Sequence, residues 1–579
     1  MQPWTQVYDP FGHWWLSALV AALPIIVLFT LMAGLRVKPH WSALAGAATA
    51  VIVAIVVFGM PWQFAGESFA YGAAIGFIKI VWIVIAAVYL YDISVSTGDF
   101  EIMKASVGGI TADRRLQLLL VAFCFGAFIE GCAGFGSPVA IAGAFMIGLG
   151  FKPFHAAALN LIANTAPVAW GAIGTPVHML ASVTQLPEAD MNAMIGRILP
   201  ITAVIVPFWL VRAMVSWKET FEVVPAITVV GVSFAAMQWF WSNKMDSNLV
   251  DITSGLFSLF CTVIFLGWIW KPKKIWRFAD DEDISKSAHT YTKGQVAKAW
   301  LPFIILSVFV FFWGFKPVKD WMNFNTTPHW FEQKMDKDGK PVMDKDGKPV
   351  KNEVKGFVTP LHNKVMRAAP VVTKPTGEGA RFDFVWLSAT GTGCFLAALL
   401  GGLIRGVSPG QLFSLFFTTL YRMRFAVLAI CGMLGLGYVT RYSGTDAVLG
   451  LAFTHTGWFF PFFGTFLGWL GVALTGSDTS SNALFGSLQR ITAEQLHIDP
   501  ILMTSANSAG GVMGKMVDAQ SICVATAATN QVGNEGIIFR FVVWHSIALG
   551  AIVGIIVMVY AYVPWAKALV PHGVKLLSH

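Results

Sequence analysis

The first candidate for chemistry in this sequence is Glu130, because it stands inside a run that is apolar enough to cross a bilayer. The surrounding stretch, FIEGCAGFGSPVAIAG at 128–143, also holds several glycines, Ser137 and Pro138. Glycine permits positive φ and close backbone approach, and proline removes a backbone donor, so a helix is expected to break here. Broken backbone at membrane depth must be buried in protein or line a watery cavity. The stretch therefore predicts a polar site near the middle of a membrane.

A second break carries Asp478, in TGSDTSSNALFG at 475–486, and Lys515 follows it along the chain. A charge at the bilayer centre costs roughly 2.5–3.5 kcal/mol on insertion scales, so each of these side chains needs a reason. Lys515 could pair with the carboxylate of a small anion, or it could form a lasting bridge to Asp518 or Asp478. The sequence leaves both roles open.

Glu130 and Asp478 are candidates for carrying a proton. Burial disfavours the charged form of a carboxyl group, so a buried Glu130 could hold and release a proton near neutral pH. The alternative is structural: a neutral Glu130 that only bonds backbone groups at the break. Asp478, which stands among hydroxyl groups, is the second choice. His155 and His178 flank the first break and titrate near physiological pH, but they are expected to face loops.

Polar side chains that suit a small anion gather in two similar segments, ANTAPVAWG at 163–171 and ANSAGGVMG at 506–514. Together with the breaks they supply the candidate binding residues, which are Ser137, Asn164, Thr165, Ser481, Asn482, Asn507, Ser508 and Lys515. Helix termini at a break also expose free N–H groups and a positive partial charge, which favour an anion. Helix capping is the alternative role for these hydroxyls and amides, and both roles can hold together.

These residues lie in a chain of 579 residues that is 56% hydrophobic and only 12% charged. Such a composition indicates an all-α membrane protein with several spans. Apolar blocks about as long as a helix that crosses ~30 Å of hydrocarbon lie near 15–35, 41–60, 72–93, 196–215, 222–242, 249–270, 299–316, 384–404, 425–441 and 537–562. The first block is long and lacks a basic segment before it, so it is expected to stay as a span.

The charge and the cysteines exclude several classes of protein. The net charge is +8, but the Lys and Arg residues fall in loops between apolar blocks and build no basic domain, so nucleic acid is not an expected partner. The six cysteines are scattered through apolar segments without a CxxC pair. Neither a disulfide framework nor a metal site is predicted, and no cofactor is expected.

The distribution of basic residues predicts the topology. The first fourteen residues contain no Lys or Arg, whereas Arg36 and Lys38 follow the first span and a basic loop begins at 271. Basic loops stay on the cytoplasmic side, so the N-terminus is predicted to be periplasmic. The remaining charges agree only if residues 116–151 enter the membrane from the cytoplasm and return to it, with Lys152 inside. This segment is therefore predicted to be a re-entrant hairpin.

An internal repeat completes the expected architecture. Each of the two similar segments follows a polar, glycine-containing break, and the charge bias places the second break in a hairpin at 461–488 that enters from the opposite side. This pattern is typical of a secondary transporter with inverted repeats. We expect about twelve transmembrane helices and two oppositely oriented hairpins, in the order: N-terminal repeat 1–270, cytoplasmic loop 271–298, connecting helix 299–316, periplasmic insertion 317–383 and C-terminal repeat 384–579.

The polar insertion contains a direct duplication, MDKDGKPV at 335–342 and again at 343–350. Asp-Gly followed by Pro-Val favours tight turns and short strands, as in a small periplasmic flap. The beginning of a calcium loop is the alternative interpretation, but the remaining ligands and the final Glu of such a loop are missing.

The motifs also resemble a known family. FIEGCAGFGSPVAIAGAFMIGLGF, LIANTAPVAWGAIGTPV, TGSDTSSNALFGSLQ and ANSAGGVMGKM are similar to segments of bacterial L-lactate permeases, in the same order. The resemblance covers nearly the whole chain outside 317–383. It implies an inner-membrane symporter of protons with L-lactate, D-lactate or glycolate, and membership of a larger ion-transporter group with paired re-entrant hairpins. It also implies that Glu130 and Asp478 couple protons, and that the candidate binding residues hold the anion. Monomer and homodimer both remain open.

The alternatives to this function are a sodium-coupled carrier, a membrane enzyme and a channel. A sodium-coupled carboxylate carrier is the alternative of the same class, because backbone carbonyls at such breaks can bind Na⁺. A membrane enzyme is disfavoured, since the sequence contains no HExxH, Gly-x-Ser-x-Gly or Walker motif. A channel is disfavoured because no filter sequence repeats along the chain.

Overall fold

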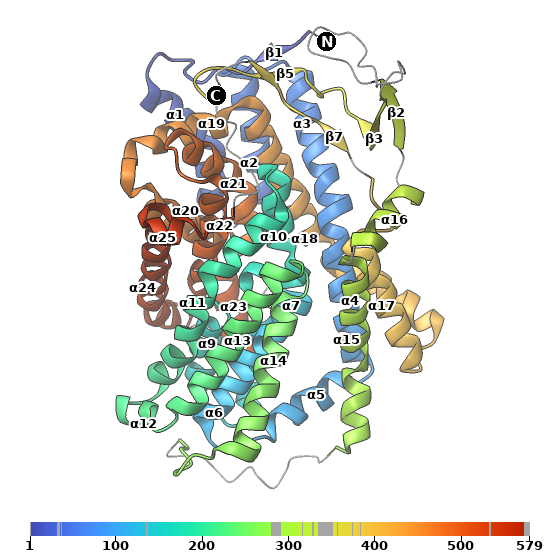
Figure 1. Ribbon diagram of the computed structural model, residues 1–579, viewed down its shortest axis with the longest axis vertical. Coiled ribbons are helices and arrows are strands. Elements are labelled where there is room, and N and C mark those ends of the chain that lie inside the picture. The colour runs from blue at the N-terminus through green and yellow to red at the C-terminus, as the bar shows by residue number, and fades with distance from the viewer. Residues whose placement is uncertain are drawn as a thin grey trace.

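The structure is a computed structural model of the chain, and it describes residues 2–31, 35, 37–134, 137–278, 291–314, 316–326, 329–333, 351–355, 357–372, 375–382, 384–531 and 534–571. Within these residues the protein is mostly helical, and its long helices run roughly along the long axis of the molecule (Figure 1). Each of the ten apolar blocks of the sequence overlaps a helix in the described part of the chain, which confirms that these blocks form helices.

The first half of the chain consists of helices with short π-helical and 3-10 segments. They are α1 Trp14–Phe29, α2 Pro39–Val56, α3 Trp62–Ile75, η2 Gly76–Val81, α4 Trp82–Ser96, α5 Asp99–Gly108, α6 Arg114–Leu118, η3 Leu119–Phe125, α7 Gly126–Ala133, α8 Ser137–Gly148, α9 Pro153–Ala163, η4 Val168–Trp170, α10 Gly171–Thr184, α11 Glu188–Met214, α12 Trp217–Phe221, α13 Val224–Lys244, α14 Val250–Ile264 and η5 Phe265–Ile269. Helix α15, Lys293–Gly314, connects this half to the insertion and begins six residues before the expected 299.

The second half begins after the insertion. It contains α17 Thr390–Ile404, α18 Pro409–Ser443, α19 Thr445–Phe453, η7 Thr454–Phe459, α20 Phe460–Thr475, α21 Asp478–Gln495, α22 Pro500–Gly514, η8 Lys515–Val517, α23 Ala519–Ala528, α24 Glu535–Tyr562 and α25 Pro564–Lys567. Among the described residues, eight helices are long and apolar enough to cross a membrane, and nine if the bent pair α9 and α10 counts as one span.

The order of elements in the first half recurs in the second. A continuous helix of 35 residues, α3 to α4, corresponds to α18, which also has 35 residues. A short helix follows each of them (α5 and α19), then a broken helix pair (α7 with α8, and α20 with α21), then a helix interrupted near its middle (α9–α10 and α22–α23) and finally a long helix (α11 and α24). With α6 and η3, which precede α7, the first broken pair covers 114–148, and the second covers 460–495; the predicted hairpins are 116–151 and 461–488.

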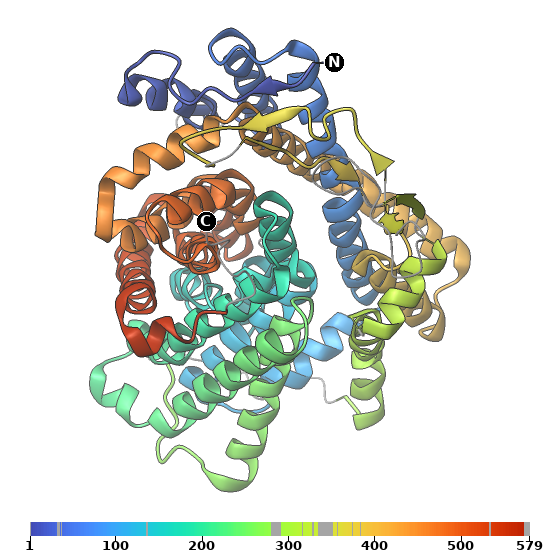
Figure 2. The ribbon, with the colours of Figure 1, turned by 45° about the horizontal axis from the view of Figure 1, so that its top comes forward.

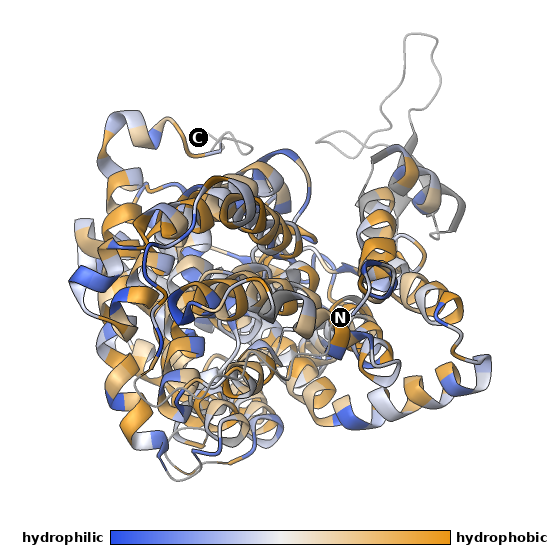
Figure 3. Ribbon diagram, turned by 90° about the horizontal axis from the view of Figure 1, so that it is seen from below, coloured by the Kyte–Doolittle hydropathy of each residue, from blue (hydrophilic) through white to orange (hydrophobic). Residues whose placement is uncertain are grey.

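The exterior of the helices suits a lipid environment. Large apolar side chains are exposed along them, including Val56 (75%), Trp268 (86%) and Trp544 (72%). Figure 3 shows apolar residues along most of the helices, whereas polar residues gather toward helix ends and connecting segments. Exposed apolar surface on this scale is expected where lipid, not water, covers the protein.

The insertion is not helical throughout and contains short strands, as the sequence predicts for this segment. Helix α16, Lys316–Thr326, is followed by short strands, which are β2 His329–Gln333, β3 Lys351–Lys355, β4 Phe357–Val358, β5 Val365–Arg367, β6 Thr376–Gly377 and β7 Arg381–Phe382. Strand β1, Trp4–Thr5, pairs in parallel with β5, so the N-terminal segment lies on the insertion. The duplicated octapeptides at 335–350 lie outside the described residues.

A buried ion-pair network attaches the insertion to α18. The Glu378 carboxylate pairs with the Arg367 guanidinium, and its second oxygen lies 2.9 Å from Arg441 Nη2. Arg441 Nη1 also donates to the carbonyl of Val183, at the end of α10. The insertion, α18 and α10 therefore meet at one end of the molecule, and Figure 2 shows the strands lying over that end.

Candidate functional site

The break after α7 positions Glu130. Helix α7 ends at Gly134, which has a φ of 58° and a ψ of −154°. A Cβ at Gly134 would lie 2.9 Å from the Cβ of Ala172, so a larger residue would collide with α10. Only glycine combines this dihedral angle with so close an approach. The end of α7, with Glu130 in its last turn, is thereby held against the interruption between α9 and α10.

That interruption has unusual backbone geometry. Helices α9 and α10 meet at an angle of 64°. Ala172 (φ 45°), Ile173 (φ 57°) and Gly174 (φ 70°) are consecutive left-handed residues between them. Left-handed dihedral angles cost of order 1–3 kcal/mol for a residue with a side chain, and they persist where the surrounding structure enforces them. A β-branched Ile173 in this conformation marks the segment as strained, which is common in binding sites.

Glu130 is buried against this strained segment. Its side chain is 3% exposed, and a Cβ at Gly171 would lie 2.4 Å from Glu130 Oε1. Among the described residues, Glu130 Oε2 has no hydrogen-bond partner. Asn164 lies close to the carboxyl group, yet neither atom of its amide is paired within the described part of the chain. The site therefore contains buried polar atoms that are available to another molecule.

The second break positions Asp478 and Lys515. Helix α20 ends at Gly476 (φ 72°), and the Ser477 side chain caps α21 by accepting a hydrogen bond from the N–H of Ser480 at 3.3 Å. Lys515, at the end of α22, donates to the Gly476 carbonyl at 2.5 Å and lies 3.5 Å from Asp518. The bridge to Asp518, one of the two roles considered for Lys515, is thus present.

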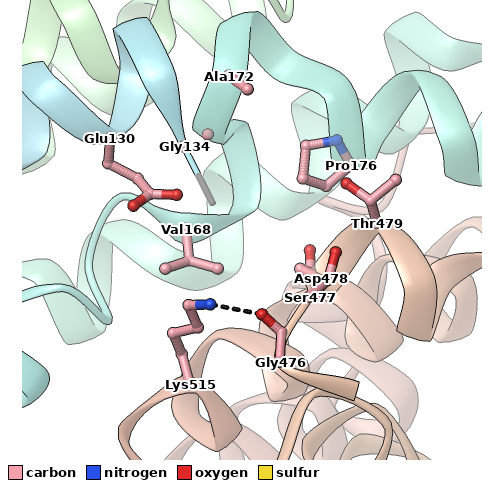
Figure 4. A pocket seen from close by; sticks show the side chains of 11 residues that line it. Glu130, Gly134, Val168, Ala172, Pro176, Gly476, Ser477, Asp478, Thr479 and Lys515 are labelled. Atoms are coloured by element: carbon pink, nitrogen blue, oxygen red, sulfur yellow. Dashed lines mark hydrogen bonds between the residues drawn. The ribbon is translucent and has the colours of Figure 1, made fainter. Parts of the chain in front are cut away.

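Both breaks open onto one small cavity of about 30 Å³. Figure 4 shows Glu130, Asp478 and Lys515 around it, contributed by α7, α21 and the end of α22. Ser477, Asp478 and Thr479, at the N-terminus of α21, line the cavity, so the positive end of that helix lies beside it. A cavity of ~10–15 Å³ holds one water molecule, so this one suits a few waters or a very small solute. It combines one cation, a helix N-terminus and two carboxyl groups.

Asp478 is held by a hydrogen-bond network beneath the cavity. Asp478 Oδ2 accepts from Ser508 Oγ at 2.5 Å and from Asn482 Nδ2 at 3.4 Å. Asn507 Nδ2 donates to Asn482 Oδ1 at 2.9 Å, and Gln489 Nε2 donates to Asn507 Oδ1 at 3.3 Å. All these side chains are buried. The network fixes the orientation of Asp478 relative to α22.

The structure divides the candidate residues into two layers. Glu130, Asp478 and Lys515 line the cavity. Ser481, Asn482, Asn507 and Ser508 lie one layer behind it, in the network or against backbone carbonyls. Thr165 Oγ1 donates to the Ile162 carbonyl at 2.7 Å, which is a capping contact at the end of α9. Nothing is described of the Ser137 side chain.

Some lining residues were not among the candidates. Gly134, Val168, Gly171, Ala172, Pro176, Gly476, Ser477 and Thr479 also line the cavity. Ser477 and Thr479 stand in the same motif as Asp478, so their hydroxyl groups could have been proposed with Ser481. The apolar residues that line the cavity have no chemical group that could have marked them as candidates in the sequence. Their role follows only from the approach of the two breaks.

Both histidines contact connecting segments, as the sequence predicts. His178, on α10, has Nε2 2.8 Å from Oδ1 of Asn248, in the segment between α13 and α14, and its Nδ1 lies 3.1 Å from Glu188. His155 is half-buried beside Phe278. Among the described residues, no group of three or more His, Cys, Asp or Glu side chains could share a metal ion.

Long apolar helices around a buried, charged cavity define a multi-pass membrane protein with an internal site for a small polar solute. The chain belongs to the L-lactate permease family, because the model of that family matches residues 17–564. It is therefore a membrane transporter, located in the bacterial inner membrane.

Two relatives in Escherichia coli K12 span nearly the same length. Glycolate permease GlcA is 44% identical over 579 residues, which cover 97% of this chain and 99% of that protein. An L-lactate permease is 43% identical over 568 residues, with the same coverage. Among solved structures, MtrF of Neisseria gonorrhoeae, described with a class of antimetabolite efflux pumps, has a TM-score of 0.43 at 12% identity, over 86% of this chain and 84% of MtrF.

Proposed function

We propose that the protein imports small 2-hydroxymonocarboxylates, namely L-lactate, D-lactate and glycolate, together with protons. The observation that carries this proposal is the convergence of Lys515, the N-terminus of α21 and the carboxyl groups of Glu130 and Asp478 on one cavity. A cation and a helix N-terminus suit a carboxylate. Buried carboxyl groups beside them suit a proton that travels with it.

The charge of the site favours a compact anion with one carboxylate. Lys515 is the one basic side chain that lines the cavity in the described part of the chain. A tricarboxylate would require more positive charge than one lysine and one helix terminus provide. Ser477 and Thr479 line the cavity, and their hydroxyl groups can hydrogen-bond the 2-hydroxyl of the substrate. The names of the relatives, glycolate permease and L-lactate permease, support the same class of substrate.

Proton coupling follows from the electrostatics of import. Lactate is ionised at neutral pH, and moving one negative charge inward against an inside-negative potential costs ~2.3 kcal/mol per 100 mV. A proton bound at Glu130 cancels this charge, so the pH gradient drives uptake and the voltage contributes little. Once the substrate has left, Glu130 releases its proton and becomes the counter-ion of Lys515, which interacts with it electrostatically. The empty carrier can then reorient without carrying a proton back.

Uptake into liposomes that contain the purified protein tests this function. An inward proton gradient should drive accumulation of labelled L-lactate, and glycolate and D-lactate should compete with it. Inhibition by citrate alone would overturn the proposed substrate class. Replacing Na⁺ by K⁺ should leave uptake unchanged, whereas strong inhibition by this replacement would favour the sodium-coupled carrier.

The proposed topology has about twelve spans, a periplasmic N-terminus and two oppositely oriented re-entrant pairs, α7 with α8 and α20 with α21. The repeated order of elements in the two halves supports it. Lys152 is the exposed residue that precedes α9, so Lys152→Cys tests the orientation of the first pair. An impermeant thiol reagent should label this cysteine only from the cytoplasmic side. Labelling only from the periplasm would contradict the proposed topology.

A further inference from the structure

Asp251, near the start of α14, is a buried carboxyl group that the mechanism above does not use. It is fully buried, and neither of its oxygens has a hydrogen-bond partner among the described residues. Other buried aspartates do have partners: Asp99 pairs with Arg405, Asp446 accepts from Ser487, and Asp518 accepts from the N–H of Ser521. A buried polar group without a partner needs an explanation, because it costs about 1–3 kcal/mol.

The position of Asp251 places it next to the proton site. Helix α14 packs on α7, and a Cβ at Gly131 would lie 3.0 Å from the Cβ of Asp251. One turn further along, a Cβ at Gly255 would lie 2.8 Å from the N atom of Phe128, so the two helices are in close backbone contact. Asp251 thus lies against the residue that follows Glu130, and the two carboxyl groups interact electrostatically.

Two buried carboxyl groups this close do not both ionise. Burying an isolated carboxylate is far more costly than the total stability of a protein, so an unpaired Asp251 carries a proton in this conformation. Two carboxyl groups that share a site therefore retain at least one proton between them. Lys515 lines the same cavity as Glu130, so its positive charge favours ionisation of Glu130 over ionisation of Asp251. The pair then consists of an ionised Glu130 beside Lys515 and a protonated Asp251 behind it.

A second, much larger cavity of about 840 Å³ lies beside α10. His178 and Glu188 line its wall. His178 contacts Asn248 at 2.8 Å, and Asn248 stands three residues before Asp251, at the entry to α14. A Cβ at Gly174 would lie 2.3 Å from the Ser247 carbonyl, so this entry is packed directly on the strained segment of α10. Polar groups therefore extend from the large cavity to within one helical turn of Asp251.

We propose that Asp251 is a second proton-binding group of the transporter, which passes a proton between His178 at the large cavity and Glu130 at the small one. This inference rests on the proposed proton symport. When the anion binds, the Asp251 carboxylic acid gives its proton to the Glu130 carboxylate. The Asp251 carboxylate then receives a proton from the His178 imidazolium, and His178 is reprotonated from water. Each step transfers one proton, so the pair takes up one proton in all and changes from one negative charge to neutral while the anion is bound.

The surroundings of Asp251 offer few competing groups. Helix α7 contributes Glu130 and Cys132, and η3 contributes Cys124, whose Sγ lies 3.4 Å from Ser258 Oγ. The only ionisable side chain of α13 is Lys244, which is exposed. Helix α10 carries His178, which contacts Asn248 in the segment before α14, and that segment also carries Asp246, whose Oδ1 accepts from the N–H of Asn248 at 2.9 Å. In the described part of the chain, Glu130 is the carboxyl group that interacts electrostatically with Asp251, and His178 is the imidazole nearest to the start of α14 along these contacts.

The test compares net uptake with exchange in liposomes that contain the full chain. Asp251→Asn should slow lactate uptake driven by a pH gradient by about 100-fold, the lower range for loss of a positioned proton-transfer group. Exchange of labelled for unlabelled lactate requires no net proton transfer and should stay within about twofold of wild type, a difference of less than ~1 kcal/mol. Asp190→Asn, on the same side of the protein in the first turn of α11, is the matched control and should change neither rate.

His178→Gln provides a second variant, because glutamine retains a hydrogen bond to Asn248 but cannot carry a proton. It should also slow net uptake and spare exchange. Equal loss of uptake and exchange in both variants would overturn the proposal, and so would wild-type net uptake in both. Absence of proton-driven uptake by the wild-type protein would instead refute the symport itself. In detergent, lactate should trigger proton binding, followed with a pH-indicator dye, in wild type and Asp190→Asn, and this signal should be lost in Asp251→Asn.

Discussion

The two halves of the site differ in how they hold their carboxyl groups. Glu130 lies over Gly171 beside left-handed backbone, with Oε2 unpaired within the described part of the chain. Asp478 lies over Gly511, and its Oδ2 accepts hydrogen bonds from Ser508 and Asn482. Each carboxyl group therefore has one oxygen without a partner in the described part of the chain, Glu130 Oε2 and Asp478 Oδ1, but only Asp478 is also anchored by donors from α21 and α22. The comparison suggests that the first half of the site moves the proton, while the second half orients the anion.

Replacing each of the two carboxyl groups by an amide should give the largest difference in transport between the two halves of the site. Glu130→Gln should abolish accumulation of lactate under a pH gradient but leave exchange, because exchange moves no net proton. Asp478→Asn should keep accumulation and raise the half-saturation concentration about tenfold, which corresponds to ~1.4 kcal/mol of binding. Uptake in liposomes measures both. Full accumulation by Glu130→Gln would remove it from the proton path and transfer that role to Asp478.

The glycines beneath the two carboxyl groups allow a matched test of the next largest effect. A Cβ at Gly171 would lie 2.4 Å from Glu130 Oε1, and one at Gly511 would lie 2.2 Å from Asp478 Oδ1. Because Glu130 is longer and less restrained, Gly171→Ala should displace its carboxyl group, with loss of accumulation and little loss of stability. Gly511→Ala presses on an anchored group and should lower stability by about 1–3 kcal/mol.

Gly148→Ala is the control for this pair, because a Cβ there would have no neighbour within 4 Å. It should leave transport and thermal unfolding in detergent unchanged. Equal stability of Gly171→Ala and Gly511→Ala would show that the two carboxyl groups are held alike, which would remove the contrast.

A smaller difference in stability is expected when the polar residues next to the two carboxyl groups are replaced. Ser508→Ala removes the 2.5 Å hydrogen bond to Asp478 and should destabilise the protein by about 1.5–3 kcal/mol if that group is charged. Asn164→Ala removes an amide that has no partner among the described residues, so thermal unfolding should hardly change. A higher half-saturation concentration for Asn164→Ala would identify its amide as a ligand of the substrate. Unchanged stability of Ser508→Ala would mean that Asp478 is not anchored by it.

The smallest effects are expected for Thr165 and Ser481, one from each half. Thr165 Oγ1 donates to the Ile162 carbonyl at 2.7 Å, and Ser481 Oγ donates to the Gly468 carbonyl at 3.1 Å. Replacing either by alanine removes one neutral hydrogen bond, worth about 0.5–1.5 kcal/mol, and should leave substrate affinity unchanged. A tenfold loss of affinity (~1.4 kcal/mol) in one of them, with unchanged unfolding temperature, would restore it as a substrate ligand.

Much of this site could be predicted before its geometry was known. Glu130, Asp478 and Lys515 stood out because ionisable groups in apolar segments are costly, and all three line the cavity. The neighbouring serines and asparagines stood out because their hydroxyl and amide groups suit a small anion, but the sequence could not say which of them reach the cavity. That distinction depends on side-chain direction around α21 and α22, where Ser481 and Asn482 point toward other helices.

The apolar helices, their repeated order and the two breaks could be predicted from the chain, because helix length, glycine and proline act locally. What the breaks enclose depends on contacts between helices that are far apart in the chain. Gly171 lies under Glu130, and Asp251 lies against Gly131, although each pair is separated by many residues in the chain. Such contacts arise from the packing of α7 against α10 and α14. Local sequence records that a carboxyl group is present, whereas its partners, and therefore its charge, are set by the helices that pack around it.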